Sequence, residues 1–252
     1  MIVDPSFYAV ALPAVVLYGF SKGGFSGVGL LSVPLMSMVM SPVQAAAILL
    51  PVLLVQDVVT IYAYRHDWDR QTLIMTLPGA LVGIGLGAAT AAIVSNDLIR
   101  LAIGCLALAF CLNYWLGQRR GAEVAVPHAS APAAVLSTIA GYTSFVLHAG
   151  GPPFNMYALP RLIEPVRFVG TAGVFFGLLN IIKVPPYFLL GQFNVNNLLL
   201  SAVLVPVAVL GNVAGIWLVR RLPKEKFFSA VYALTALVGA KLIVDGLGLF
   251  SH

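Results

Sequence analysis

The chain has 252 residues, of which 60% are hydrophobic and only 9% are charged, and its mean hydropathy is +0.97. Soluble domains carry roughly 25% charged residues, so this composition excludes a soluble protein and indicates a multi-pass membrane protein. The net charge of +5 is therefore attributed to basic loops at the membrane surface and not to nucleic-acid binding.

The first apolar stretch runs from residue 7 to residue 40 and contains one charged side chain, Lys22. A straight helix of that length would be about 50 Å long, whereas the hydrocarbon core of a bilayer is roughly 30 Å thick. The two glycines after Lys22 can leave the helical conformation at low cost. We therefore expect segments 7–21 and 25–40, joined by a break that is buried in protein or lines a cavity. This break is the first candidate site.

The later apolar segments complete two halves separated by a linker at 118–131. In chain order they are 43–64, 71–94, 98–116, 132–149, 154–163, 166–190, 197–219 and 226–249. Segments longer than about 18 residues qualify as membrane-spanning helices, and the first two of each half are short for a span. The sequence predicts one transmembrane transporter domain, 1–252, with repeats at 7–117 and 132–250.

Three blocks of matching residues support this duplication, at offsets of 126, 123 and 128 residues. The pairs are Lys22/His148, Gly24/Gly150, Pro34/Pro160, Pro42/Pro165, Asp57/Asn180, Tyr64/Tyr187, Pro78/Pro206, Gly83/Gly211 and Gly87/Gly215. Glycine and proline are common in membrane helices, so chance matches are the alternative. The conserved order and nearly constant spacing of the blocks favour an internal repeat.

The distribution of lysine and arginine predicts how the halves are oriented. If each break is a hairpin, ten basic residues lie on one side of the membrane. Two basic residues, Arg100 and Lys183, then lie on the other side. If the breaks are kinks within single crossings, the loops split five to seven. Basic residues concentrate in cytoplasmic loops, which favours the hairpins. The ten are Arg65, Arg70, Arg119, Arg120, Arg161, Arg167, Arg220, Arg221, Lys224 and Lys226.

The predicted fold is thus an all-α polytopic membrane protein. It is an inverted repeat of two five-segment halves, each starting with a broken or re-entrant helical hairpin. Both termini are expected to be periplasmic and the linker cytoplasmic. Secondary transporters with inverted repeats bind substrate near the midplane, where broken helices meet.

Two such hairpins would bring Lys22 and His148 together and form an anion site, because helix N-termini carry partial positive charge. The alternative is that the glycines serve only helix packing, that Asp57 neutralises Lys22, and that His148 is a satisfied core residue. The candidate substrate-binding residues are Lys22, Gly23, Gly24, Ser26, His148, Gly150, Gly151 and Asn155.

Asp57 and its repeat partner Asn180 are the candidate coupling residues. Asp57 either exchanges a proton during transport or forms a fixed ion pair with Lys22, and both interpretations stay open. Lys183, one turn after Asn180, is expected to extend outward to the membrane surface. The loop 65–70 contains histidine and aspartate, and we interpret it as a self-neutralising interfacial turn anchored by Trp68 and not as a metal site.

Residues 22–35 (KGGFSGVGLLSVPL), Gly150-Gly151 and residues 158–161 (ALPR) resemble the TauE/SafE sulfite-exporter family. That family is known for a duplicated hydrophobic unit with a glycine-rich stretch followed by a proline in each half, and the resemblance covers essentially the whole chain. It implies transport of sulfite, sulfonates or other small anions in either direction. The second half departs from the pattern with Gly-Gly-Pro-Pro-Phe at 150–154, which predicts a stiffer second hairpin.

We therefore expect a secondary transporter that moves sulfite or an organosulfonate across the bacterial plasma (inner) membrane. Its expected partners are the small anion, the lipid bilayer and, as candidate coupling ion, the proton. No nucleophile-elbow, metal-ligand or phosphate-loop motif occurs in the sequence, so neither an enzyme nor a cofactor is expected. The alternatives are an uptake permease for another small organic anion, a non-transporting membrane subunit and an intramembrane enzyme.

Overall fold

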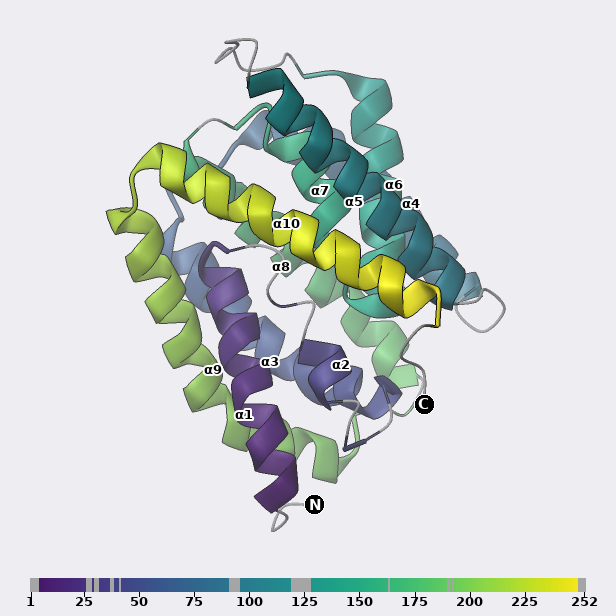
Figure 1. Cartoon of the computed structure of the whole chain (residues 1–252). Coiled ribbons are helices and arrows are strands. Elements are labelled where there is room, and N and C mark those ends of the chain that lie inside the picture. Colours follow the sequence, from purple (N-terminus) through teal and green to yellow (C-terminus); the bar gives the residue numbers. More distant parts are fainter. Residues whose placement is uncertain are drawn as a thin grey trace. The chain divides into compact units, whose positions relative to one another are not determined.

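A computed structural model describes residues 5–25, 29, 32–36, 39–40, 42–90, 96–118, 128–162, 164–189, 191 and 193–248. Over these residues the chain is helical and contains no strand (Figure 1). The helices are α1 (Pro5–Gly23), α2 (Ser32–Met36), α3 (Pro42–Ala63), α4 (Arg70–Thr90), α5 (Asn96–Gln118), α6 (Ser130–Leu147), α7 (Gly151–Ala158), α8 (Pro165–Leu189), α9 (Val195–Arg221) and α10 (Lys224–Gly246).

Five helices of the described chain are long and apolar enough to cross a membrane: α3, α4, α8, α9 and α10. They coincide within a few residues with five predicted spans, which confirms a multi-pass helical architecture. The sixth predicted span, 98–116, is the continuous helix α5. The hairpin arms α1, α2, α6 and α7 are not among the five, in keeping with their predicted shortness.

The structure confirms a break in each half and corrects the helix that follows each break. The arm predicted at 25–40 is not one helix: Phe25 is not helical, and the described helix in this range is α2, which has five residues. The arm predicted at 154–163 is α7, which begins earlier, at Gly151. Proline is favoured in the first turn of a helix, so the prolines of this segment start α7 sooner than apolar periodicity alone suggested.

The chain divides into two compact units, which are described separately. The first unit comprises Met1–Trp68 and Val169–Leu222. In it α1 packs along α9 and against α3 (Figure 1). A Cβ atom at Gly19 would lie 2.2 Å from the carbonyl oxygen of Ala208, so this approach of α1 to α9 requires glycine. Small and aliphatic residues of α1, α3 and α9, with Met36 of α2, form the buried core around this contact.

The second unit comprises Asp69–Phe168 and Pro223–His252. In it α4 packs on α6, α5 packs on α10, and α7 lies against α5 and α6. A Cβ atom at Gly83 would lie 2.0 Å from the carbonyl oxygen of Thr138, so α4 and α6 also meet through glycine. In the first unit, α1 is the first segment of the first predicted half and α9 is the fourth segment of the second half. In the second unit, α6 is the first segment of the second half and α4 is the fourth segment of the first half.

Candidate functional site

The break after α1 is a helix C-terminus closed by glycine. The amide of Phe25 donates to the carbonyl of Phe20 at 3.4 Å, and the amide of Gly24 donates to the carbonyl of Ser21 at 3.2 Å. Gly24 has φ +151°, and the ring of Phe25 stacks on that of Phe20 with centroids 4.6 Å apart. These are the bonds and the apolar contact of a Schellman motif. Phe25 therefore caps α1 and does not begin the next helix.

Side chains of Thr60 in α3 and of Tyr64, which follows α3, hold the carbonyl groups at this end of α1. Thr60 donates to the carbonyl of Lys22 at 3.3 Å, and the Tyr64 hydroxyl donates to the carbonyl of Gly23 at 3.1 Å. Asn212 of α9 in turn donates to Thr60 at 3.0 Å. Carbonyls at a helix end have no partner within the helix, so this buried network fixes where α1 stops. The sequence had not singled out Thr60 or Asn212.

Lys22 forms a buried ion pair next to the break. Its ammonium lies 2.5 Å from Asp57 Oδ1, and the exposed fractions of the two side chains are 10% and 4%. The amide of Asn180 donates to the other carboxylate oxygen of Asp57 at 2.6 Å. Asp57 thus contacts both Lys22 and Asn180, and Asn180 is the repeat partner of Asp57. The structure contains a Lys22–Asp57 ion pair, and the function of Asp57, proton exchange or a fixed ion pair, stays a prediction.

Glycines on α8 leave room for side chains of α3. A Cβ atom at Gly173 would lie 2.7 Å from the Thr60 side chain, and one at Gly177 would lie 2.8 Å from the Ile61 side chain. A larger residue at either position would meet these side chains. The ring of Phe176 also lies beside the Lys22 ammonium, with 5.6 Å between the nitrogen and the ring centroid. Aliphatic packing and a cation–π contact therefore frame the ion pair.

Lys183 does not extend outward as predicted, because only 1% of the residue is exposed. It lies one turn beyond Asn180 on α8 and interacts electrostatically with both Lys22 and Asp57. Its spacing of three residues from Asn180 places the two on one helix face, and this was the signal available in the sequence. We refer to Lys22, Asp57, Asn180 and Lys183 as the Lys22 cluster.

The second break follows α6 and lies in the second unit. His148 has φ +51° and is buried, and its amide donates to the carbonyl of Thr143. Gly150 is the N-cap of α7, which begins at Gly151. The amide of Asn155 donates to Thr235 of α10 at 3.2 Å. These four candidates lie along one short stretch of chain.

Lys22 and His148 belong to different units, so their predicted meeting near the membrane midplane stays a prediction. Ser26, the remaining candidate ligand, lies outside the described residues.

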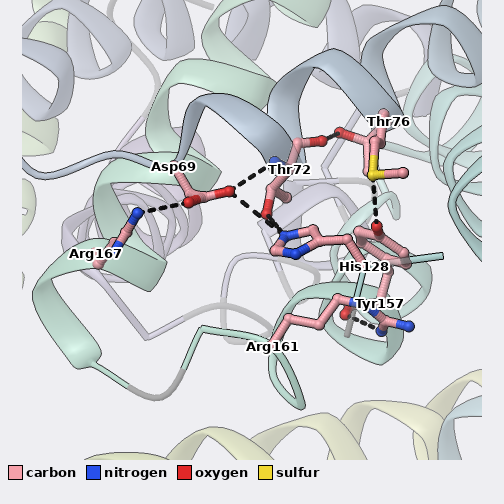
Figure 2. A network of polar contacts seen from close by, with 8 residues as sticks. Asp69, Thr72, Thr76, His128, Tyr157, Arg161 and Arg167 are labelled. Carbon is pink, nitrogen blue, oxygen red and sulfur yellow. Dashed lines mark hydrogen bonds and ion pairs between the residues drawn. The ribbon is translucent and has the colours of Figure 1, made fainter. Parts of the chain in front are cut away.

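Asp69 of the loop after α3 is neutralised by residues outside the loop, whereas the predicted self-neutralising turn would neutralise it within the loop. Asp69 Oδ2 pairs with Arg167 at 2.7 Å, and Asp69 Oδ1 lies 3.5 Å from His128 and accepts the Thr72 amide at 2.7 Å (Figure 2). These partners lie outside the loop. Burial raises the pKa of Asp69, but the two Thr72 hydrogen bonds and the charges of Arg167 and His128 outweigh it and hold that pKa below its ordinary value.

A second part of the same network surrounds Tyr157. The Arg161 guanidinium lies over the Tyr157 ring, 4.1 Å from its centroid, and donates to the Tyr157 carbonyl at 2.7 Å (Figure 2). The Tyr157 hydroxyl lies 3.6 Å from the Met75 sulfur. These contacts attach the end of α7 to α4. We interpret both parts of the network as structural. Asp69 binds the start of α4 through the Thr72 amide and pairs with Arg167 of α8, and Arg161 binds the carbonyl of Tyr157 near the end of α7.

The Lys22 cluster places ionisable side chains, those of Asp57 and Lys183, within helices long and apolar enough to cross a membrane. Intramembrane charges mark transport pathways, so this cluster is the candidate anion site. Within the described chain, no group of three or more His, Cys, Asp or Glu side chains is placed to hold a metal ion.

Comparisons with known proteins identify a family. The family model described as sulfite exporter TauE/SafE matches residues 11–242, which is nearly the whole chain. Among curated proteins and solved structures, none matches the chain significantly.

Proposed function

Because the chain belongs to the sulfite exporter TauE/SafE family, we propose that it is a secondary transporter of a small sulfur-containing anion, sulfite or an organosulfonate, in the bacterial plasma membrane. The observation that carries this proposal is the buried Lys22–Asp57 pair at a helix break. A charge at membrane depth is costly and is retained where a substrate or coupling ion uses it. Lys22 and the neighbouring Gly23 and Gly24 are the proposed substrate contacts in the first half.

Inverted repeats are common in secondary transporters, and three observations support one in this chain. The helix pairs α1–α9 and α4–α6 combine the halves reciprocally. Repeat partners Asp57 and Asn180 are hydrogen-bonded to each other, as residues beside a pseudo-two-fold axis would be. Gly211 contacts Val16 in one unit and Gly83 contacts Tyr142 in the other, and Val16 and Tyr142 are related by the same 126-residue offset as Lys22 and His148.

The proposed mechanism is alternating access around two re-entrant breaks. His148, Gly150, Gly151 and Asn155 are the proposed substrate contacts in the second half, and Asp57 would exchange a proton during transport. The prolines at 152 and 153 would make the second break the stiffer one. Both termini would be periplasmic, and the 118–131 linker would be cytoplasmic.

Ligand-dependent thermal stabilisation of the purified full chain tests this function. A ligand that binds only the folded state raises stability, by about 2.7 kcal/mol at a hundredfold excess over its Kd. We expect one or more of sulfite, sulfoacetate, taurine and thiosulfate to raise the melting temperature, while chloride at equal ionic strength does not. Lys22→Ala should lose the effect.

The matched control is Lys241→Ala, which removes the lysine of another Lys–Asp pair, Lys241–Asp245 of α10. This variant should retain stabilisation by the anion. If no anion stabilises the wild type, or if Lys241→Ala loses the effect as Lys22→Ala does, the proposed anion site is wrong.

A further inference from the structure

The Lys22 cluster contains more positive than negative groups. In helices α1, α3, α8 and α9 the single acidic residue is Asp57. Two amino groups therefore act on one carboxylate: Lys22 pairs with it, and Lys183 interacts with it electrostatically. All three groups are largely buried, since Lys183 is 1% exposed and the side chains of Lys22 and Asp57 are 10% and 4% exposed.

Burial makes an uncompensated net charge expensive, and ionisable groups then gain or lose protons to remove it. The cluster has three groups that can do so. With Asp57 ionised and Lys183 neutral, the cluster carries no net charge. With both lysines charged and Asp57 protonated, it carries two positive charges. The cluster can thus match a bound anion of one or two negative charges by taking up protons.

We propose that Lys183 is the second cation of the anion site, and that the Lys22 cluster admits a divalent anion by taking up about one proton more than it does for a monovalent anion. This inference rests on the proposed transport function and adds to it a charge class of substrate. It also makes Lys183 the residue that distinguishes divalent from monovalent anions. Neutralisation within the site would let anion and proton move together without transferring net charge.

The other titratable and charged groups around the cluster are few. Helix α1 contributes Tyr18, which interacts electrostatically with Asp57 and with Tyr187 of α8. Tyr64, the residue after α3, is bonded to the Gly23 carbonyl and interacts electrostatically with Asp67. Helix α9 contributes Arg220, whose guanidinium lies 5.7 Å from the centroid of the Tyr64 ring. Phenols ionise near pH 10 and guanidinium groups stay charged, so the difference in proton uptake near pH 7 falls to Lys22, Asp57 and Lys183.

Two sulfonates with the same two-carbon skeleton, isethionate and sulfoacetate, test whether proton uptake depends on the charge of the anion. Isethionate carries one negative charge and sulfoacetate carries two, and neither gains or loses a proton near pH 7. Calorimetric titration of the full chain, in two buffers with different ionisation enthalpies, gives the protons taken up per anion. We expect sulfoacetate to take up about one proton more than isethionate. Equal uptake, with both anions bound, would overturn the inference and leave the proposed function standing.

Variants of the cluster provide the second measurement. Lys183→Met keeps the length and apolar stem of the side chain but removes the cation, so sulfoacetate affinity should fall at least about tenfold relative to isethionate affinity. Lys183→Arg should keep the preference for the divalent anion because guanidinium remains charged. Asp57→Asn should bind sulfoacetate while losing part of the proton uptake. The control Lys241→Met should behave as the wild type.

Two other results would overturn the inference. An unchanged ratio of sulfoacetate to isethionate affinity in a folded Lys183→Met variant would reduce Lys183 to a structural residue and overturn the inference. If the wild type binds neither sulfonate, the inference fails, and the proposed function fails with it only if sulfite, taurine and thiosulfate also do not stabilise the protein.

Discussion

Substituting Gly23 by alanine should move α1 away from α9 and weaken both stability and anion binding. A Cβ atom at Gly23 would lie 2.5 Å from the carbonyl oxygen of Asn212, and 2.7 Å from Gly215 Cα and from the Ile216 amide nitrogen. All three are backbone atoms, so no side chain can rotate away to make room. Ordinary contacts are about 3.5–4 Å, and the helices must therefore separate by roughly an ångström.

Overpacking of this kind costs about 1–3 kcal/mol. In a protein of this size each kcal/mol corresponds to roughly 2–4 °C, so the melting temperature should fall by roughly 2–12 °C. The matched control is Gly85→Ala in α4, where a Cβ atom meets nothing within 4 Å. Alanine is the better helix former by roughly 0.5–1 kcal/mol, so this variant should melt at or slightly above the wild-type temperature.

Thermal unfolding of the two purified variants, with and without a stabilising anion, is the assay. Gly23→Ala should also lose part of the anion-dependent rise, because Gly23 separates Lys22 from the capping residue Gly24. A Gly23→Ala protein that melts at or above the wild-type temperature would refute the close α1–α9 contact, and with it the geometry given for the break.

Three further predictions concern charge. Lys22→Arg should restore only part of the anion binding that Lys22→Ala loses, because guanidinium is wider and differently hydrated; full rescue would show that position 22 needs only a positive charge. A reporter fused after residue 252 should be periplasmic and one within 119–127 cytoplasmic, and reporters on the same face would exclude the hairpin topology. Because the pKa of Asp69 is lowered, its stabilisation should be present at neutral pH and lost as the pH falls below about 4. Asp69→Asn should therefore melt lower at pH 7 and show a flatter acid dependence, and identical melting curves at pH 7 would contradict this.

The spanning helices were predictable from the sequence because long apolar runs leave few alternatives in a membrane. The predicted 43–64 and 166–190 correspond to α3, Pro42–Ala63, and α8, Pro165–Leu189. The break at Lys22 was also predictable, since paired glycines beside a charge interrupt an overlong helix. The helix expected from residue 25 was wrong because Phe25 stacks on Phe20 and caps α1, a contact that hydrophobicity does not reveal.

The repeat pointed to some residues of the candidate site. Residues whose position depends on how the helices pack could not be predicted from the sequence. Asp57 and Asn180 were found through their equivalent positions, and the structure places them in contact. Lys183 was assigned to the membrane surface because a long side chain near a helix end can reach it. Lys183 is instead 1% exposed. Its burial is a property of the folded chain, as are the bonds from Thr60 and Tyr64 to the end of α1.

Counterflow in liposomes tests the central claim most directly, namely that the chain transports a small sulfur-containing anion through the Lys22 cluster. Liposomes containing the purified protein are loaded with the unlabelled sulfur-containing anion that stabilises it most and are diluted into the same anion with a label. We expect transient accumulation of label with the wild type and with Lys241→Ala, and none with Lys22→Ala. Accumulation by Lys22→Ala at the wild-type rate, or none by the wild type above protein-free liposomes, would contradict the central claim.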